Sequence, residues 1–305
     1  MSLPMRSTDF RSVVEPILNE VFDGVYDQRD DEWTQVCKER QGIKRAYHEE
    51  PILYGFNAAP EVPDGDPITY GQGGELFRQR YIYRVFGLAF ALTRILVEDG
   101  DHIAIGKIFA EHLAQSMSET KETLVAQIFN RAFNAAYPGG DGVSMNANNH
   151  PIVGTTFSNL LTTAAALSQT STEQMLVQIR SAVDANGKKI KLKPVRFIVS
   201  PSNMFQAEVI VRSVLRTGGA NNDINPVKSM GLLAQGVAVL SRVTSTTAWW
   251  IQNGNVSRGV QLMMRRSLSK AMEGDFETDS MRYKSTERYW ASWTDPRDNW
   301  GTPGL

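Results

Sequence analysis

The four histidines are the first residues to test for catalysis or metal binding, because imidazole serves in both. His48, His102, His112 and His150 lie far apart, and no His-x-x-x-His, Cys-x-x-Cys or His-Glu-x-x-His spacing is present. Metal ligands on one helix or loop normally show such local spacing. The sequence therefore predicts no metal site and no cofactor, and we expect His112 to pack on the apolar side of a helix.

Two glycine clusters could bind a phosphate or a calcium ion. Residues 71–74 (GQGG) lack the Lys-Ser/Thr of a phosphate-binding loop and precede an expected strand instead of a helix. Residues 139–142 (GGDG) lack the alternating oxygen ligands and the closing glutamate of an EF-hand. We interpret both as turns. No Gly-x-Ser-x-Gly elbow occurs either, so a non-enzymatic protein is favoured, with a soluble α+β enzyme as a minor alternative.

Two charged sets could instead bind a protein partner. Arginines share one face of an expected strand: Arg78, Arg80 and Arg84. An acidic run lies earlier in the chain: Asp27, Asp30, Asp31 and Glu32. Each set is most simply a solvated face. A sharper hypothesis is that the arginines of one subunit bind the acidic run of a neighbour, since guanidinium–carboxylate pairs fix docking geometry.

The segment between these two sets is predicted to be extended. Glycine and proline recur through residues 49–74, so the segment can form turns and extended chain but not a central strand. A disordered loop is the alternative, and the apolar residues argue against it. We expect four of them to contact a neighbouring subunit: Tyr54, Phe56, Ile68 and Tyr70.

A strand and a long helix follow. Alternation predicts one strand face made by Phe77, Gln79, Tyr81, Tyr83 and Val85. Asp99 and Asp101 then supply N-cap chemistry, and a 3.6-residue period, including Phe109, predicts a single helix over residues 103–137, about 50 Å long. Residues 138–140 (PGG) are expected to end it. One subunit cannot bury such an arm and helix by itself, so the sequence indicates neighbours.

The remaining elements predict an α+β protein. Pro16 is expected to break or start an N-terminal helix, and residues 33–37 to open a short strand or turn. A capping box at residues 171–174 is expected to start a helix that ends at residues 186–187, and a Ser200-Pro201 start precedes another that ends at residues 218–219. Strands are expected near residues 196–200, 236–240, 247–252, 260–264 and 281–293.

Composition excludes several functional classes. Lys+Arg 32 against Asp+Glu 33 gives a net charge of -1, so no global positive field draws the chain to nucleic acid or an anionic membrane. No stretch reaches the ~18 apolar residues of a membrane span, and the N-terminus has no secretory pattern. The one cysteine, Cys37, excludes an internal disulfide and fits a reducing cytoplasm.

Several segments taken together resemble one known family. They are FNAAP (56–60), QSMSET (115–120), FNAAYPGGDG (133–142) with His150-Pro151, NDIN (222–225), AWW (248–250) and tail motifs within 273–297. In this order, over about residues 23–301, they resemble the major capsid proteins of tailed bacteriophages, and more narrowly a Mu-like head-protein group. Each motif alone is weak, and the ordered set is specific.

The resemblance implies the Hong Kong 97-type capsid fold. It implies an N-terminal arm (1–47), an extended E-loop (48–75), a peripheral domain with the spine helix (76–138) and an axial domain (139–265). C-terminal strands (266–305) would return to the peripheral and axial sheets. In this family the E-loop lies over an adjacent subunit.

The resemblance also implies a function. Hexamers and pentamers of the chain would form an icosahedral head in the virion, assembled in the bacterial host cytoplasm and enclosing double-stranded DNA without reading its sequence. A separate scaffolding protein, a portal and decoration proteins are the expected partners, and no membrane is involved. No lysine occurs between Lys44 and Lys107, so we expect a non-covalent shell. A cargo-enclosing nanocompartment of the same fold is the alternative.

Overall fold

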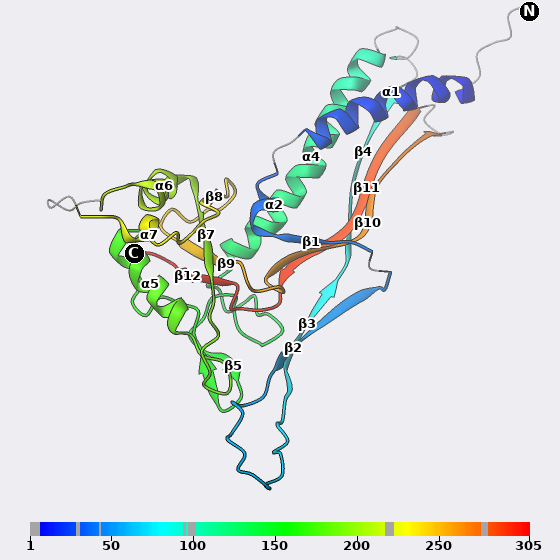
Figure 1. Ribbon diagram of the computed structural model, residues 1–305. Coiled ribbons are helices and arrows are strands. Elements are labelled where there is room, and N and C mark those ends of the chain that lie inside the picture. Colours follow the sequence, from blue (N-terminus) through cyan, green and yellow to red (C-terminus); the bar gives the residue numbers. More distant parts are fainter. Residues whose placement is uncertain are drawn as a thin grey trace, which may run out of the picture.

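The computed structural model describes residues 7–28, 31–42, 44–93, 96, 102–216, 223–275 and 280–305. The expectations for Asp30, for the N-cap residues Asp99 and Asp101, and for a helix stop at residues 218–219 lie outside these residues. Figure 1 shows an elongated molecule with long helices beside a curved sheet at one end, a second sheet with shorter helices at the other, and a projecting hairpin. It is a mixed helix and strand structure, as predicted.

The first body is a sheet with helices on one face. Its four strands lie in the order β1 (Lys38–Arg40), β10 (Val260–Asp275), β11 (Ser280–Trp293) and β4 (Arg84–Thr93). The long helices α1 (Ser7–Asp27) and α4 (His102–Asn130) pack together and against this sheet. Strands β10 and β11 form a long antiparallel pair, with two irregularities between Met264 and Ser269.

Helix α1 runs through Pro16 without a break, so the predicted break is wrong. Pro16 lies on the exposed face, whereas Val14, Leu18 and Phe22 are buried against α4. Packing of this apolar face stabilises the helix enough to tolerate the missing backbone hydrogen bond of proline.

Helix α4 is a single long helix, but it ends at Asn130 and not at residue 137. Its 29 residues span about 43 Å. The Asn130 side chain donates to Arg242 O (3.0 Å) and accepts from Thr244 N (2.9 Å), which ties the helix end to the second body. The predicted apolar stripe holds at Leu113 and Met117, which are buried, but Phe109 is 41% exposed. His112 is exposed too, so its predicted packing role is wrong.

The glycines after α4 permit close packing and do not end the helix. A Cβ atom on Gly139 would collide with the Trp293 ring, and one on Gly140 with the Arg78 backbone. The loop that follows α4 therefore lies directly against β11 and the hairpin.

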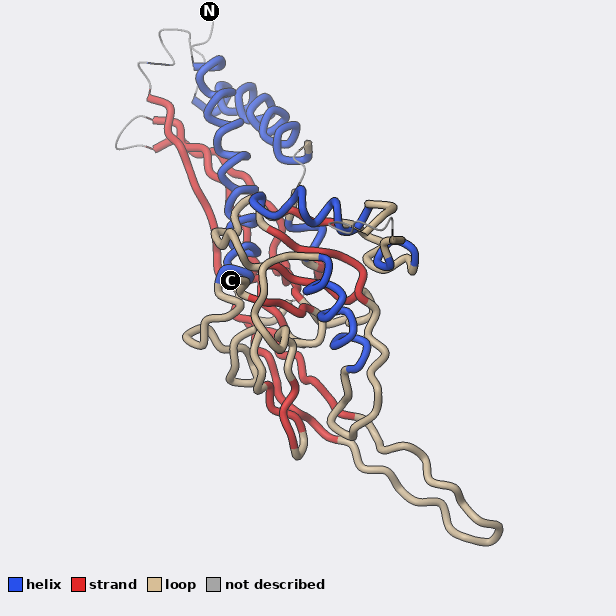
Figure 2. The backbone as a smooth tube through the Cα atoms, turned by 90° about the vertical axis from the view of Figure 1, so that its left-hand side faces the viewer, coloured by secondary structure: helices blue, strands red, loops and turns tan. Residues whose placement is uncertain are grey.

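The projecting hairpin pairs β2 (Tyr47–Tyr54) with β3 (Gly74–Ile82) in antiparallel register. Residues 55–73 join them as a loop that extends away from both bodies (Figure 2). The predicted strand over residues 77–85 is divided at Tyr83, because β3 pairs with β2 while β4 pairs with β11. Alternation holds through the buried Tyr81 and Tyr83, but Val85 is 59% exposed and does not share their face.

The second body is built on the sheet β12 (Asn299–Thr302), β9 (Trp249–Asn253), β7 (Pro194–Val199) and β8 (Val237–Val239). Helices α5 (Gln169–Ser181), α6 (Met204–Arg212) and α7 (Pro226–Ser229) contribute to its core, and the 3-10 turn η1 (Pro201–Asn203) directly precedes α6. Helix α5 is capped by Ser168, which exchanges hydrogen bonds with Ser171, so the predicted cap at residues 171–174 is wrong. The helix also ends before residues 186–187. A short hairpin pairs β5 (His150–Ile152) with β6 (Thr155–Phe157).

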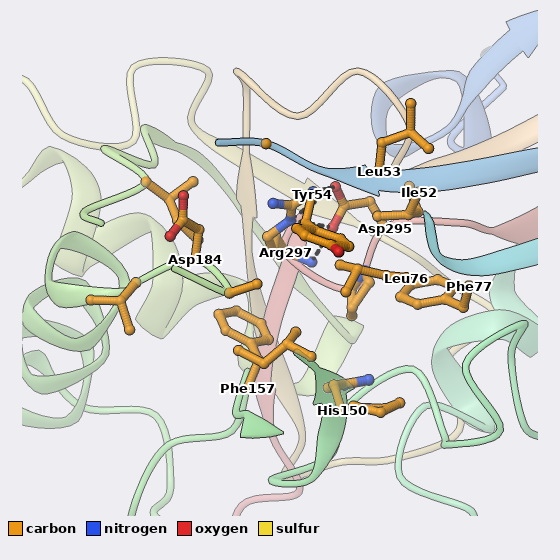
Figure 3. Close-up of a pocket in the computed structure, with 17 residues that line it drawn as sticks. Ile52, Leu53, Tyr54, Leu76, Phe77, His150, Phe157, Asp184, Asp295 and Arg297 are labelled. Atoms are coloured by element: carbon orange, nitrogen blue, oxygen red, sulfur yellow. Dashed lines mark hydrogen bonds and ion pairs between the residues drawn. The ribbon is translucent and has the colours of Figure 1, made fainter. Parts of the chain in front are cut away.

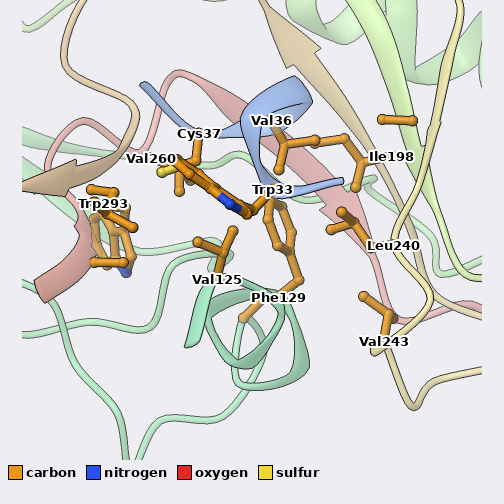
Figure 4. Packing of buried hydrophobic residues seen from close by; sticks show 14 of the residues in the cluster. Trp33, Val36, Cys37, Val125, Phe129, Ile198, Leu240, Val243, Val260 and Trp293 are labelled. Carbon is orange, nitrogen blue, oxygen red and sulfur yellow. The ribbon is translucent and has the colours of Figure 1, made fainter. Parts of the chain in front are cut away.

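One hydrophobic core joins the two bodies (Figure 4). The short helix α2 (Trp33–Val36) contributes Trp33 and Val36 to this core, which also contains Val125 and Phe129 of α4 and Ile198 of β7. A helical turn therefore replaces the strand that residues 33–37 could have formed. Cys37 is buried in this core, and burial raises the pKa of its thiol. Among the described residues, no helix is long and apolar enough to cross a membrane.

Candidate functional site

The loop of residues 55–73 exposes large apolar side chains. Ile68 is 80% exposed, Tyr70 is 95% exposed and Phe56 is 60% exposed. The Tyr54 ring lies close to Gly74 and the Phe56 ring to Gly71, so side chains of the two limbs partly cover the loop backbone. Apolar side chains this far from any core of their own chain indicate a surface that another molecule covers.

The root of the hairpin is held by a buried carboxylate. Glu50 of β2 is 4% exposed, and its Oε1 accepts from Arg40 Nη1 at 2.6 Å. Its Oε2 accepts from Gln261 Nε2 (3.0 Å) and Thr294 Oγ1 (2.9 Å). The Thr294 hydroxyl also bonds to Tyr81 OH, on β3, at 2.5 Å. One carboxylate thus joins the hairpin to β1, β10 and the end of β11, and sets where the hairpin leaves the sheet.

A second contact holds the outer part of the hairpin. Asn186 donates to Gly55 O (2.8 Å) and Lys188 donates to Phe56 O, both from the turn after α5. Beside this contact lies a pocket of about 80 Å³ between the hairpin, β5 and residues 295–297 (Figure 3). Among its polar groups, Arg297 and Asp295 form an ion pair with each other (2.6 Å). The pocket is small, and Asp184 and His150 also line it.

The predicted arginines lie at the hairpin with partners in their own chain. Arg78 pairs with Glu75 (2.9 Å) and Glu49 (3.2 Å), and Arg80 lies 3.6 Å from Glu49. Arg84 lies over the ring of Trp290, 4.4 Å from its centroid. The structure therefore brings Arg78 and Arg80 together around Glu49, with Arg84 apart on the next strand.

The acidic residues of the N-terminal region lie beside α4. Asp27 is exposed, and Asp31 accepts from Ser118 Oγ (2.9 Å). Glu32 accepts from Ser241 N (2.7 Å) and pairs with Arg242 (3.5 Å). Asp31 and Glu32 thus contribute to the junction of the two bodies within one chain, while binding of this run to a neighbour's arginines stays a prediction.

Besides the Glu50 network, two buried ionic clusters were missed by sequence reasoning. His150 is 1% exposed, with Nδ1 2.5 Å from Asp141 Oδ2 and Nε2 3.1 Å from Asn159 Oδ1. The Asn159 amide is oriented by its own bonds, because Nδ2 donates to backbone carbonyls and Oδ1 accepts from Ala147 N (2.9 Å). Both imidazole nitrogens therefore lie within hydrogen-bond distance of oxygen atoms. The resembling segment 133–142 and His150-Pro151 mark this cluster in the sequence.

The second cluster ties α1 to the sheet through α4. Lys121 Nζ lies 3.0 Å from Glu287 Oε1, and Tyr26 OH donates to the same oxygen at 2.8 Å. Burial, followed by the Glu287 charge, raises the pKa of Tyr26. No sequence spacing could reveal this cluster, since its three residues come from distant elements. Within the described ranges, no group of three or more His, Cys, Asp or Glu side chains could hold a metal ion.

Comparison with known families agrees with this geometry. The sequence profile of the family described as "Phage capsid protein" matches residues 83–298. The chain belongs to this phage capsid protein family. It is a structural capsid protein, and the match does not favour the nanocompartment alternative. Among curated proteins, none matches the chain.

Solved capsids share the fold at low sequence identity. The mature capsid of bacteriophage PhiM1 matches with TM-score 0.57 and 11% identity, over 90% of this chain and 87% of that one. The empty GTA particle capsid matches with TM-score 0.54 and 11% identity, over 89% of both chains. The bacteriophage JBD30 capsid matches with TM-score 0.52 and 10% identity, over 92% of this chain and 68% of that one. The predicted Hong Kong 97-type fold is therefore confirmed.

Proposed function

We propose that this capsid protein polymerises as hexamers and pentamers into a closed icosahedral head that encloses double-stranded DNA, and that each subunit is joined to the next by its 55–73 loop. The exposed apolar side chains of that loop carry the proposal. Ile68 and Tyr70 gain burial only if a second copy covers them, and many such contacts add up in a closed shell.

The proposed function also implies a division of the chain into five parts. We propose an N-terminal arm (1–47), an E-loop (48–75), a peripheral domain (76–138), an axial domain (139–265) and C-terminal strands (266–305). Strand β10 runs continuously across residue 265 into the peripheral sheet, and β12 returns to the axial sheet. The chain therefore passes several times between the peripheral and axial parts, and these crossings connect the two parts mechanically.

The partners of the shell follow from the family. We propose a separate scaffolding protein, a portal and decoration proteins, assembly in the host cytoplasm, and no enzymatic activity of the subunit. Because the loop contains no lysine, its contacts would be non-covalent. The packaged DNA would be enclosed without sequence-specific binding, in keeping with the net charge of -1.

Charged side chains near the hairpin would contribute to docking. The candidate contact residues are Tyr54, Phe56, Ile68 and Tyr70 on the loop, Arg78, Arg80 and Arg84 beside it, and Asp27, Asp30, Asp31 and Glu32 on the arm. Arg78 and Arg80 are about half exposed, so a neighbour's carboxylate could still reach them. Asp31 and Glu32 would first have to leave Ser118 and Arg242.

Replacement of two loop residues tests the proposal. The wild-type chain, purified with its scaffolding protein, is expected to sediment as capsomers or megadalton particles that appear as shells in negative-stain microscopy. The double variant Ile68→Ser, Tyr70→Ser should lose shells yet keep its thermal unfolding midpoint, because both side chains are exposed within the subunit.

The intervening Thr69 provides a matched control on the same loop. Thr69→Ala should assemble as the wild type does, since it removes no large apolar surface. Shells of normal yield from the double variant would refute the role of the loop. A wild-type chain that runs only as a small oligomer would refute the shell itself.

A further inference from the structure

A groove lies beside the second half of α4, where the helix faces the start of β4 and the end of β11. It consists of a hollow of about 360 Å³ and a smaller one of about 140 Å³, which share Gln127 and Trp290 in their lining. Figure 1 shows α4 beside these two strands. On the helix side the lining recurs every three or four residues, so it occupies one face: Thr120, Thr123, Leu124, Gln127 and, one residue past α4, Arg131.

Two arginines line the groove, and each lies over an aromatic ring. The Arg84 guanidinium is 4.4 Å from the centroid of Trp290, and that of Arg131 is 4.2 Å from the centroid of Tyr137. Both arginines are exposed, and within the described ranges neither forms an ion pair. A guanidinium that stacks on a ring keeps its N–H edge available, and that edge matches the oxygens of a phosphate group.

The groove carries a net positive charge. Among the described residues that line it, the one carboxylate is Glu119, which accepts from Arg242 Nε at 2.5 Å. The Thr123 hydroxyl and the Gln127 amide add two polar side chains, and the part of the chain that the structure describes supplies no hydrogen-bond partner for either. An anion in the groove therefore meets uncompensated cations and unused donors.

A nucleic-acid strand fits this donor set better than a protein segment does. A phosphodiester backbone presents acceptor oxygens, whereas a peptide would also bring backbone N–H groups that need acceptors. Residues 120–131 span about 16 Å at the helical rise. One DNA strand carries a phosphate about every 3.4 Å along the duplex axis. The groove is thus long enough for about four or five nucleotides of one strand.

The charge elsewhere on the chain makes this groove the preferred place for such a contact. The net charge of -1 provides no general attraction for a polyanion. Several other exposed arginines already share a carboxylate: Arg78 with Glu75, Arg212 with Glu208, and Arg282 with Asp275. Binding of nucleic acid therefore has to be local, at cations that lack such a partner.

We propose that this groove binds the phosphodiester backbone of the enclosed nucleic acid, with Arg84 and Arg131 on phosphates and with Thr123 and Gln127 donating beside them. The contact reads no sequence, because every nucleotide presents the same phosphate oxygens. This inference rests on the proposed function and names the residues at which the shell contacts its DNA. It also gives Arg84 a partner different from that of Arg78 and Arg80.

Duplex binding by the purified full-length chain tests the contact. The anisotropy of a short fluorescent DNA duplex, measured at several salt concentrations, gives the affinity and its salt dependence. The variant Arg84→Gln, Arg131→Gln should bind at least about tenfold more weakly at low salt, and the slope of log K against log salt should fall by about two, since each phosphate contact contributes about 0.9. Both side chains are exposed, so the thermal unfolding midpoint should stay unchanged.

Two exposed arginines outside the groove supply the matched control. Arg212→Gln, Arg282→Gln removes the same charge from ion pairs on other elements. Its affinity for the duplex should lie within about twofold of the wild type, because charges distant from the contact are screened by salt.

Tryptophan fluorescence gives a second measurement that does not depend on charge. Trp290 lies in the groove and is partly buried, whereas the other five tryptophans are at most 6% exposed. Addition of the unlabelled duplex should change the emission of the wild type. Trp290→Phe keeps a ring beneath Arg84 and should bind the duplex without this change.

Each contrary result overturns the proposal in a different way. Equal affinity and equal salt slope for the wild type and the groove variant would remove the arginines from the contact. A groove variant that binds the duplex normally but forms no shells would show that the groove holds a second copy of the chain. Binding of inorganic phosphate without binding of the duplex would show a site for free phosphate only. The duplex measurement uses the purified chain, so it decides the groove even where the wild type forms no shells and the proposed function fails.

Discussion

Removal of the Glu50 carboxylate should loosen the root of the projecting hairpin. Glu50→Ala leaves three donors without their acceptor, on Arg40, Gln261 and Thr294. A charge-assisted hydrogen bond contributes about 1.5–3 kcal/mol and a neutral one about 0.5–1.5 kcal/mol. Arg40 can turn to solvent, since its side chain is 40% exposed, whereas the buried amide of Gln261 cannot. The free energy of unfolding should therefore fall by about 3–5 kcal/mol.

Calorimetry and amide exchange measure this loss. For a chain of 305 residues, about 4 kcal/mol corresponds to a fall in Tm of about 6 °C. Exchange should accelerate first in β2 and β3, because the carboxylate joins these strands to the sheet. Glu50→Gln keeps the volume and one acceptor and should cost less, about 2 kcal/mol.

The adjacent Glu49 supplies the control. It points to the other face of β2 and makes only partly exposed ion pairs with Arg78 and Arg80, so Glu49→Gln should cost at most about 0.5 kcal/mol. The reasoning is refuted if the two glutamates prove equivalent, or if Glu50→Ala unfolds within about 1 kcal/mol of the wild type.

Two further changes probe other buried charges. Burial raises the pKa of Asp298 to about 7, although a hydrogen bond from Gln252 opposes the rise. Because the folded pKa lies above the unfolded value, the stability that the protonated Asp298 contributes is present below about pH 4 and declines by up to about 4 kcal/mol toward pH 7. Denaturant titrations at several pH values should show a smaller decline for Asp298→Asn than for the wild type. An identical pH profile of the two chains would contradict this assignment. Lys121→Met leaves Glu287 as an unpaired buried charge, so the free energy of unfolding in urea should fall by about 3–5 kcal/mol. Tyr26→Phe removes only one hydrogen bond to Glu287 and should lower it by about 1 kcal/mol. A Lys121→Met chain more stable than the wild type would disprove the stabilising role of the ion pair.

The sequence predicted those elements whose signals are local. The strand expected over residues 281–293 is β11, and the Ser200-Pro201 start precedes η1 and α6. Helix ends were less predictable, because α4 ends where Asn130 meets the backbone of residues 242–244, far away in sequence. The same holds for α1, whose buried face overrides the local effect of Pro16.

Among the candidate contact residues, too, some features were predictable from the sequence and others were not. The projecting loop was predictable because its glycine and proline residues exclude a central strand, and this effect does not depend on the rest of the fold. The partners of Asp31 and Glu32 were not, since each depends on which segments the fold brings within 4 Å. The buried clusters around Glu50 and Lys121 were missed for that reason.

By itself, then, the sequence determined several parts of the molecule: a long amphipathic helix, C-terminal strands, and a loop too rich in glycine and proline to bury itself. These follow from backbone sterics and from the periodicity of apolar residues, both of which are local. Only the tertiary structure decided that β3 and β4 separate at Tyr83 and that Glu50 anchors the hairpin. The separation depends on the pairing of β4 with the distant β11, and the anchor depends on contacts of Glu50 with Gln261 and Thr294, more than 200 positions away. Such contacts leave no spacing pattern in the chain.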